Sequence, residues 1–307
     1  LTLHEYWAMC AQEGRLLRSS GELCAGPQPS ACVECIAGSE GRAYLTIRAQ
    51  RIRRLFASID HFLAPSAFLR NRYVEWGVSK RMISIIENLP ATDASEMASL
   101  DLTMLTANYN DPYLVLGYFG QVNPWKGLNL ILEAVCLARK QGAPWSLQVH
   151  GLDAAELAQR ELRGDPFYRD CLVLMDQIGS EGVELKGIYE PADLGLRLVG
   201  VHALVMGSIW YENSPMVIQE AYLHGRPVLA PRLGGMIEKV RHGSTGIGFA
   251  PGDPMDLAAW LVRLAADRDG LRQLAEGAVR AGRGLARCAP LHQRLYQRWM
   301  QQSPASE

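Results

Sequence analysis

The chain has 307 residues, which at roughly 100 to 200 residues per domain predicts two compact domains. With 48% hydrophobic and 21% charged residues, its composition is that of a globular protein and excludes collagen, coiled coil and intrinsic disorder. The 31 basic and 32 acidic residues leave a net charge of -1, so bulk charge does not direct the protein to nucleic acid or to a membrane.

The start of the chain indicates a fragment. The sequence begins at Leu1, without an initiator methionine or a signal peptide, and runs at once into the strand-like stretch Leu1-Thr2-Leu3. We therefore expect an N-terminal truncation.

Four of the seven cysteines lie near the start of the chain in a C-x13-C-x7-C-x2-C pattern. They are Cys10, Cys24, Cys32 and Cys35. A C-x2-C pair lets two thiolates converge on one metal ion, and two further cysteines can complete a tetrahedron. The pattern predicts a structural zinc site, with disulfides or free thiols as the alternatives. A catalytic zinc is not expected, because four cysteines leave no open coordination position.

A basic amphipathic helix is predicted over residues 42–58. From Arg42 to Arg81 nine basic residues stand against two acidic ones, which is a local net charge of +7. The apolar residues Ile47, Ile52, Leu55 and Phe56 fall between the arginines at helical spacing. Such a helix is most often a solvated face whose other side is core, and the alternative is a surface that contacts anionic lipid or an acidic acceptor.

The rest of the chain alternates between strands and helices. Before residue 90 we expect a strand at 61–64, a helix that ends at Trp76 and a strand at 82–86. Residues 91–111 lack periodicity and are predicted to be a linker. After the linker we expect strands at 113–119, 146–150, 183–185, 203–206 and 227–229, and helices at 127–140, 216–224, 256–266, 271–282 and 291–300. This alternation predicts an α/β fold in which helices cover both faces of a parallel sheet.

The first candidate binding loop, 117–127, follows the strand at 113–119. It turns through small residues such as Gly120 and places Lys126 just before a helix. A lysine at that point is a charge directed at any anion that occupies the helix N-terminus. The loop lacks the spacing of a P-loop and of a dinucleotide fingerprint, and a simple helix-entry turn is the alternative.

The second candidate loop, 208–220, leads into the helix at 216–224. Ser214 suits the N-cap position and Pro215 the first helical position, so the backbone amides around Asn213 to Met216 are expected to point out of the helix end. This arrangement predicts a diphosphate site.

Two carboxylates flank this predicted diphosphate site. Glu212 lies just before the helix, and Glu220 lies about one and a half turns inside it, where apolar residues surround it in the sequence. Accepting hydrogen bonds from the two hydroxyls of a ribose would give Glu220 a function there. The alternative is an exposed helix charge at Glu220 and a helix-dipole partner at Glu212.

These residues resemble family 4 of the retaining glycosyltransferases, which have the GT-B fold of two facing Rossmann-like domains. Glu212 and Glu220 match the E-x7-E motif of that family. Gly120 and Lys126-Gly127 match its phosphate-binding loop, in which Gln121 replaces a usual arginine. Gly234-Gly235, Glu238, Gly243 and Gly246 are similar to its glycine-rich G-G-x-x-E run, and the four-cysteine segment is similar to one in some bacterial members.

The resemblance implies a retaining transfer of a sugar from a UDP- or GDP-sugar to an acceptor hydroxyl, without a cofactor for the chemistry. Lys126 and the amides at Asn213 to Met216 would stabilise the leaving diphosphate without a divalent metal. Glu220 would hold the ribose, Glu212 the transferred sugar, and the loop from Gly187 to Tyr189 the base. His4 is similar to the histidine that the first domain brings to the donor sugar.

The resemblance also implies a domain organisation. Residues 1–90 are expected to be a partial acceptor-side domain, 91–111 a linker, 112–288 the nucleotide-sugar domain, and 289–307 a helix that crosses back. The expected setting is bacterial surface polysaccharide or glycolipid synthesis, in the cytoplasm, with a saccharide or lipid-linked acceptor and peripheral contact with the inner membrane face through helix 42–58. No nucleic acid partner is expected. The alternatives are an inactive nucleotide-sugar-binding fragment and a zinc-stabilised nucleic-acid binder.

Overall fold

The computed structural model describes residues 1–36, 41–88, 109, 111–285, 294–295 and 297–298. The chain divides into two compact units. Unit 1 comprises Leu1–Asn88, Trp210–Ser214 and Leu233–Glu238, and unit 2 comprises the remaining residues. Nearly all of the predicted linker 91–111 and of the predicted helix 291–300 lies outside the described residues. No helix among the described residues has the length and apolar character needed to span a bilayer.

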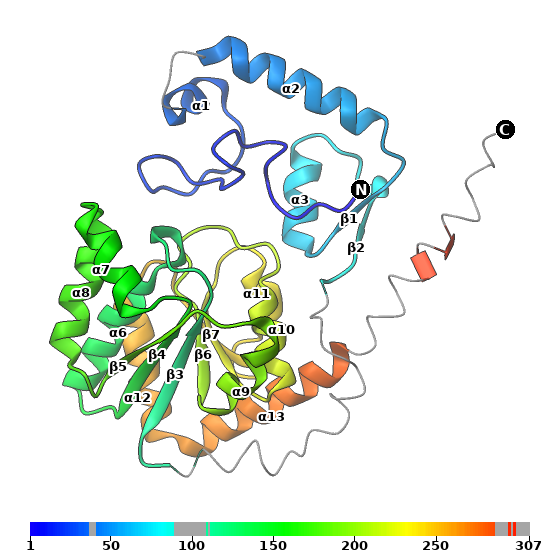
Figure 1. Cartoon of the computed structure of the whole chain (residues 1–307). Helices are drawn as coiled ribbons and strands as arrows, with labels where there is room; N and C mark the ends of the chain where they lie inside the picture. The colour runs from blue at the N-terminus through cyan, green and yellow to red at the C-terminus, as the bar shows by residue number, and fades with distance from the viewer. Residues whose placement is uncertain (37–40, 89–108, 110, 286–293, 296, 299–307) are drawn as a thin grey trace. The chain divides into compact units, whose positions relative to one another are not determined.

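Unit 2 is built on a six-stranded sheet in which all strands are parallel (Figure 1). The strands are β3 (Leu114–Phe119), β4 (Trp145–His150), β5 (Val183–Gly187), β6 (Ala203–Val205), β7 (Val228–Pro231) and β8 (Gly246–Phe249). Their order across the sheet is β5-β4-β3-β6-β7-β8. This is the doubly wound order 3-2-1-4-5-6, in which the strand order reverses between β3 and β6 and ligands bind beyond the carboxyl ends of those strands.

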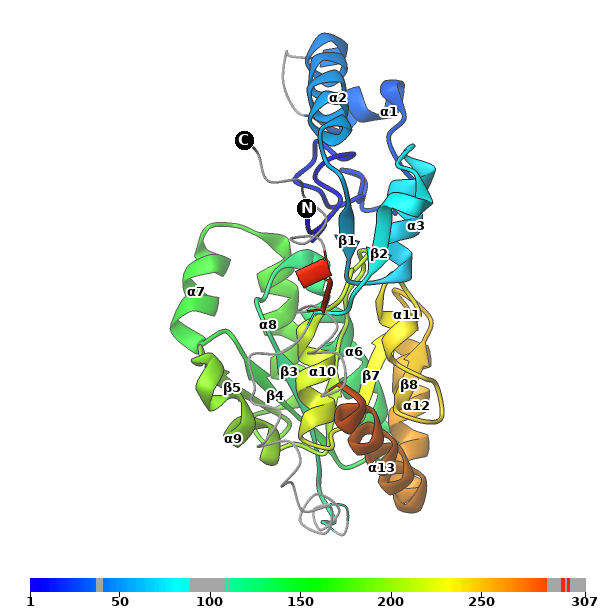
Figure 2. The ribbon, with the colours of Figure 1, turned by 90° about the vertical axis from the view of Figure 1, so that its right-hand side faces the viewer.

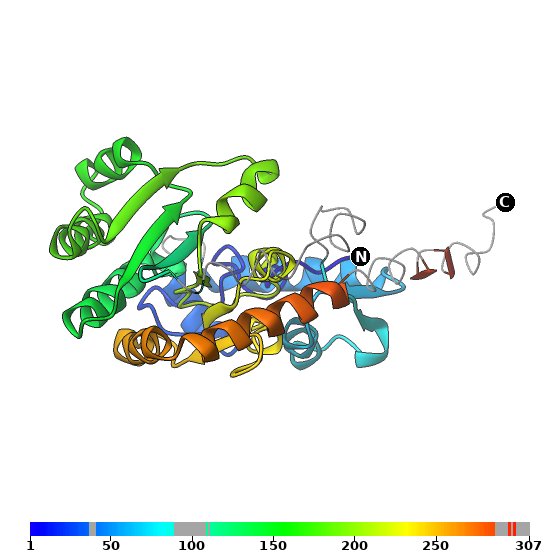
Figure 3. The ribbon, with the colours of Figure 1, turned by 90° about the horizontal axis from the view of Figure 1, so that it is seen from below.

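Helices cover both faces of this sheet, as Figure 3 shows. The helices α6 (Leu128–Lys140), α8 (Pro166–Ile178) and α12 (Pro254–Ala266) pack together on one face. The helices α9 (Leu194–Val199) and α10 (Met216–Leu223) lie on the other face, and α13 (Arg268–Leu285) packs against α10. Helix α7 (Ala154–Leu162) packs on α8. The short helix α11 (Met236–Lys239) belongs for the most part to the Leu233–Glu238 segment of unit 1.

The core of unit 2 explains why β6, β7 and β8 are apolar throughout rather than alternating. Every residue of β6, β7 and β8 is buried, as parallel strands covered on both faces require. Trp145 at the start of β4 is fully buried, and its indole N–H donates to the carbonyl of Leu261 in α12 at 2.7 Å. This bond satisfies the one polar atom of the ring inside the core.

Unit 1 contains a two-stranded parallel sheet of β1 (Phe62–Ala64) and β2 (Ile83–Ile85), shown in Figure 2. Its helices are α1 (Pro29–Cys35), α2 (Gly41–Ala57) and α3 (Ala67–Glu75). The first residues of the chain lie beside β1, since Thr2 forms a parallel bridge with Leu63. The core of this unit gathers apolar residues from the first residues of the chain, from α2 and α3 and from both strands: Leu3, Tyr6, Ala8, Met9, Leu16, Ile52, Phe62, Ala64, Leu69, Tyr73 and Ile83.

The structure confirms the predicted α/β fold with parallel sheets, and the predicted strands lie within two residues of the observed ones. The strand β8 was not predicted. Its sequence, Gly246-Ile247-Gly248-Phe249, belongs to a glycine-rich run and becomes a strand only by pairing with β7. Since a Cβ on Gly246 would lie 1.9 Å from the carbonyl oxygen of Val228, glycine permits this pairing.

Candidate functional site

Three strands of unit 2 end side by side at glycines. The Gly120 N–H donates to the carbonyl of His150 at 3.1 Å, and the Gly151 N–H donates to the carbonyl of Gly187 at 2.8 Å. A Cβ on Gly151 would lie only 2.1 Å from the carbonyl oxygen of Gly120. The carboxyl edge of β3, β4 and β5 is therefore bare backbone that a ligand can approach closely.

The turn that carries Lys126 packs against the segment that follows β6. The side chain of Asn123 accepts a hydrogen bond from the Lys126 N–H at 3.1 Å and so caps the turn. Gly127 has a φ of 64°, and a Cβ there would lie 2.0 Å from the carbonyl oxygen of Gly207. The Ile209 N–H donates to the carbonyl of Trp125 at 3.0 Å. The structure thus brings the two predicted loops together at the point where the strand order reverses.

The start of α10 differs by one residue from the prediction. Pro215 occupies the N-cap and the helix begins at Met216, so the prediction of Ser214 as the N-cap was wrong. No side chain of the described residues caps this helix end. The Oγ of Ser214 and the Oδ1 of Asn213 are buried and have no hydrogen-bond partner among the described residues. These groups offer unsatisfied polar atoms beside a helix N-terminus, where an anion is favoured.

Glu220 and Tyr189, which the sequence assigned to the ribose and the base, lie close to one another in unit 2. Glu220 is half-buried in α10, and this burial raises the pKa of its carboxyl group. Burial also raises the pKa of the Tyr189 hydroxyl, and the charge of Glu220 raises it further, while Arg197 opposes the shift. Glu220 and Tyr189 are thus near enough for the charge of the carboxylate to act on the phenol.

Sequence reasoning missed a cluster of rings beside this loop. The Phe119 and His150 rings stack at 4.1 Å with an interplanar angle of 4°, and Tyr189 lies edge-on to both. The guanidinium carbon of Arg197 lies 5.6 Å from the Tyr189 ring centroid, and Arg197 Nη1 donates to the carbonyl of Lys186 at 3.0 Å. Burial, followed by the charge of Arg197, lowers the pKa of His150 to about 4, so its ring is neutral at physiological pH.

A cavity of about 810 Å³ opens beside the glycine edge. The cavity is of the size that small-molecule sites have in proteins. Its wall on the sheet side includes Gly120, Gln121 and Tyr189, and its wall on the α7–α8 side includes Arg160 and Tyr168. Arg160 forms an ion pair with Glu156, and its Nη1 donates to the carbonyl of Val122 at 3.3 Å. This cavity can hold a nucleoside between aromatic and polar side chains.

Three predicted site residues lie together in unit 1. Glu212 is buried, and its Oε1 accepts a hydrogen bond from the Trp210 indole N–H at 2.8 Å. The Asn213 side-chain amide donates to the backbone carbonyl of His4 at 2.6 Å. The imidazole of His4 itself is exposed. The contact that the structure shows for His4 in unit 1 is thus made by its backbone.

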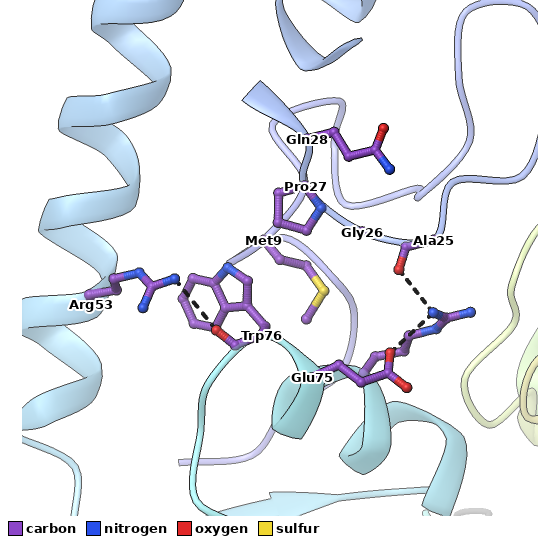
Figure 4. A pocket seen from close by; sticks show the side chains of 9 residues that line it. Met9, Ala25, Gly26, Pro27, Gln28, Arg53, Glu75 and Trp76 are labelled. Carbon is purple, nitrogen blue, oxygen red and sulfur yellow. Dashed lines mark hydrogen bonds and ion pairs between the residues drawn. The ribbon is translucent and has the colours of Figure 1, made fainter. Parts of the chain in front are cut away.

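Unit 1 has a pocket of its own that the sequence analysis did not identify, and Figure 4 shows it. The pocket has a volume of about 340 Å³. Arg72 Nη1 donates to the carbonyl of Ala25 at 2.9 Å and pairs with Glu75, and Arg53 lies beside the ring of Trp76 at 5.1 Å. Guanidinium groups around an aromatic ring suit a saccharide or an anionic group. No short sequence motif marks these residues, which come from separate segments.

The structure does not support the predicted zinc site. In the part of the chain that the structure describes, which includes all four cysteines of the pattern, no group of three or more His, Cys, Asp or Glu is placed to hold a metal ion. Cys10, Cys24, Cys32 and Cys35 are half-buried free thiols. Burial raises the pKa of the Cys32 thiol, and the neighbouring cysteines raise it further.

Residues 113–267, just over half of the chain, match the family described as "Glycosyl transferases group 1". The chain belongs to this family. The match spans the sheet of unit 2 from β3 to β8, together with both loops described above. It therefore includes Lys126, Glu212 and Glu220.

Curated relatives of this group 1 glycosyl transferase come from several bacteria. Glycogen synthase of Thermus thermophilus is 29% identical over 181 residues, which are 56% of this chain and 38% of that protein. D-inositol 3-phosphate glycosyltransferase of Nocardia farcinica is 25% identical over 298 residues, which are 92% of this chain and 63% of that protein. The chain thus spans 38% to 63% of the length of these relatives.

Solved structures of glycosyltransferases share the fold. Anabaena HepE in complex with UDP-glucose aligns with a TM-score of 0.63 and 21% identity, over 83% of this chain and 68% of that one. Sucrose-phosphate synthase from Thermosynechococcus elongatus aligns with a TM-score of 0.62 and 20% identity, over 87% of this chain and 65% of that one. These similarities confirm the predicted GT-B type of fold.

Proposed function

We propose that this chain transfers a sugar, with retention of configuration, from a UDP- or GDP-sugar to a hydroxyl group of a saccharide or lipid-linked acceptor. The observation that carries the proposal is the packing of the Lys126 turn against the segment that leads from β6 to α10. HepE, which has a similar fold, binds UDP-glucose. The names of the bacterial relatives favour a setting in polysaccharide or glycolipid synthesis, and we place the reaction in the cytoplasm.

Donor binding would use the carboxyl edge of the unit 2 sheet. Lys126 and the amides at the start of α10 would bind the diphosphate, each charge-assisted hydrogen bond contributing about 1.5 to 3 kcal/mol. The Ser214 hydroxyl would meet a phosphate oxygen, since it is buried without another partner among the described residues. Glu220 would accept hydrogen bonds from the ribose, and the glycine edge with Tyr189 would hold the base.

In the proposed chemistry the bond between the anomeric carbon and the diphosphate oxygen breaks, and a bond to the acceptor oxygen forms on the same face of the sugar. The acceptor proton passes to the leaving phosphate oxygen. Lys126 and the uncapped amides of α10 would neutralise the developing charge, so the proposal requires no divalent metal. Glu212 and His4 remain the proposed contacts of the transferred sugar.

Nucleotide binding tests the first half of this proposal. One of the three nucleotides UDP, GDP and ADP should raise the temperature at which the purified chain unfolds. Lys126→Ala should abolish this shift. Lys140→Ala, at the opposite end of α6, is the matched control and should behave as the wild type. No shift with any nucleotide, or an undiminished shift in Lys126→Ala, would contradict the donor site.

Transfer itself needs a second assay. Release of labelled sugar from the donor to a saccharide or lipid-linked acceptor should be measured with the donor that the binding assay selects. Binding without transfer or donor hydrolysis would favour the alternative of a nucleotide-sugar-binding chain without activity. Activity that is lost in EDTA and restored by a divalent ion would contradict the metal-independent chemistry.

A further inference from the structure

Helix α2 is strongly basic and has no compensating acid. Its 17 residues include five arginines and no aspartate or glutamate. Two of the arginines serve the fold of unit 1. Arg48 donates to the carbonyls of Trp7 and Ala8, and Arg53 donates to the carbonyl of Trp76 at 3.5 Å.

The outward side of α2 is apolar as well as basic. Ile47 and Leu55, which the sequence assigned to an apolar face between the arginines, are 50% and 55% exposed. Tyr44 is 40% exposed. At about 100° between successive helical residues, Tyr44, Ile47, Arg51, Arg54 and Leu55 fall within an arc of about 100°. The buried Ile52 lies outside this arc, toward the core.

Two arginines on this arc are available to a partner. Arg51 and Arg54 are exposed, and neither forms a hydrogen bond or ion pair with another residue that the structure describes. No helix or strand of unit 1 lies over the upper side of α2 in Figure 1. Since α2 contains no aspartate or glutamate, the charge of these two arginines is not compensated within the helix.

Trp7 extends the same surface. Its ring is 53% exposed, although tryptophan is highly buried on average. The guanidinium carbon of Arg48 lies 4.8 Å from the ring centroid and holds Trp7 beside α2. Arg48 is one turn from Tyr44 and two turns from Leu55, so the indole flanks the apolar residues of the arc.

We propose that Trp7, Tyr44, Ile47, Arg51, Arg54 and Leu55, here called the α2 surface, bind the surface of an anionic lipid bilayer. Aromatic and aliphatic side chains interleaved with arginines are suited to the boundary between headgroups and acyl chains. A negative bilayer surface attracts basic residues, and apolar burial adds to that attraction. The helix would lie in the plane of the interface without spanning it.

Charge complementarity favours lipid over a protein partner. Helix α2 carries five arginines and no acidic residue, and an anionic bilayer offers negative charge along the whole length of a helix that lies in its plane. In an interfacial helix the long arginine side chains reach the phosphate groups while neighbouring apolar residues enter the acyl boundary. This inference goes beyond the proposed function, because lipid binding is measured without any sugar donor.

Vesicle flotation tests the inference. The full chain should bind vesicles of phosphatidylcholine mixed with phosphatidylglycerol, and it should not bind vesicles of phosphatidylcholine alone. Binding should weaken at high salt, because screening shortens the range of the attraction. Arg51→Gln with Arg54→Gln should weaken binding about thirtyfold, equivalent to about 2 kcal/mol at about 1 kcal/mol per basic residue.

Matched variants distinguish binding through the α2 surface from nonspecific adsorption of exposed apolar side chains. Ile47→Ser with Leu55→Ser should also reduce binding, whereas Leu162→Ser with Leu196→Ser should not, although those leucines of unit 2 are 82% and 79% exposed. Thermal unfolding confirms that each variant is folded. Equal binding to both kinds of vesicle, no binding, or wild-type binding by the arginine variant would each overturn the inference.

A spectroscopic measurement gives an independent answer. Lipids brominated in the acyl chain should quench tryptophan fluorescence of the bound protein, and Trp7→Phe should remove that part of the quenching. Unchanged quenching in Trp7→Phe would overturn the assignment of this surface. A lipid-free dimer that the Ile47 and Leu55 variants dissociate would show instead that a second copy covers it.

Discussion

Arg197 donates a hydrogen bond from Nη1 to Nδ1 of His150 over 3.1 Å, which fixes the tautomer of the histidine. A guanidinium group can only donate, so Nδ1 is the acceptor and the proton of the neutral ring lies on Nε2. This Nε2 is buried and has no hydrogen-bond partner among the described residues. Arg197 also donates to the carbonyls of Lys186 and Ile188 at the end of β5. It therefore links the end of β5 to His150 at the end of β4.

His150 should make the stability of unit 2 depend on pH. As pH falls below 6.5 the unfolded chain binds a proton at this histidine, but the folded chain does not until about pH 4. The contribution of the neutral His150 to the free energy of unfolding is therefore fully present above pH 6.5. It is lost as the pH falls through this window, and the loss amounts to about 3 kcal/mol. Denaturant unfolding across the window should show a smaller loss for His150→Phe than for the wild type. His4→Phe, at an exposed histidine, should keep the full loss; equal slopes for all three proteins would refute the assignment.

Removing the Arg197 guanidinium should weaken nucleotide binding rather than abolish folding. Arg197→Gln loses the bonds to the loop before Tyr189 and frees that loop, so the Kd for the selected nucleotide should rise about tenfold, or about 1.4 kcal/mol. Calorimetric titration gives the Kd. Arg263→Gln removes another arginine that stacks on a ring, that of Trp260, and should leave the Kd unchanged. An unchanged Kd in Arg197→Gln would show that the loop needs no such support.

Glu220→Gln should increase the stability of the unliganded protein and weaken nucleotide binding. The raised pKa of this carboxyl shows that burial opposes its charged form, so at neutral pH the charge costs stability that a neutral amide does not. The unliganded variant should melt at a higher temperature than the wild type and lose most of its nucleotide-induced shift. Glu133→Gln, on the exposed side of α6, is the control and should change neither value. A variant that melts lower and still binds nucleotide would count against the role of Glu220.

Gly151→Ala should disrupt the glycine edge. The new Cβ would meet the carbonyl oxygen of Gly120 at 2.1 Å and would also be strained by the φ of 121°. We expect a loss of about 2 to 4 kcal/mol of unfolding free energy, combining overpacking and backbone strain. Gly164→Ala carries similar strain, with a φ of 81°, but meets no atom within 4 Å. Gly164→Ala should therefore lose less unfolding free energy in the same denaturant titration, and the difference between the two variants is the steric cost at Gly151. Equal losses would show that the close approach of Gly120 has no steric cost.

Glu238 should contribute to the stability of unit 1 as a helix cap. Its carboxylate accepts hydrogen bonds from the Ala67 and Phe68 N–H groups at the start of α3, where Ser66 also caps the Leu69 N–H. Glu238→Ala should lower the unfolding free energy by about 1 kcal/mol, the usual value of an N-terminal cap. Glu22→Ala, at an exposed glutamate in the same unit, provides the comparison. Identical melting of the two variants would mean that Ser66 alone suffices.

The sequence predicted those features that depend on local pattern. Lys126 was identifiable because it follows a strand and adjoins a helix, and Glu220 because it lies in the helix that follows the second loop; the strand order then brings the two loops together. The family of the chain was identifiable from the same residues. Their roles toward a donor sugar stay predictions.

Other features depend on contacts between distant segments and had no local signal. His150 in β4 and Arg197 in α9 lie 47 residues apart and meet only in the folded unit. Ile47 and Leu55 have the spacing of core residues, yet α2 turns them outward. The spacing of the four cysteines permits a metal site, but among the described residues no group of three or more His, Cys, Asp or Glu is placed to hold a metal ion.

The composition of unit 1 limits how the chain can be divided. Trp210–Ser214 and Leu233–Glu238 belong to unit 1, so the backbone passes from one unit to the other at four points beyond the first connection. A protein cut after residue 88 would lack the Tyr211 ring, which packs on Phe68, and the carboxylate that caps α3. The two halves are therefore not separable modules, and swapping the first 88 residues between relatives would require grafting both short loops as well.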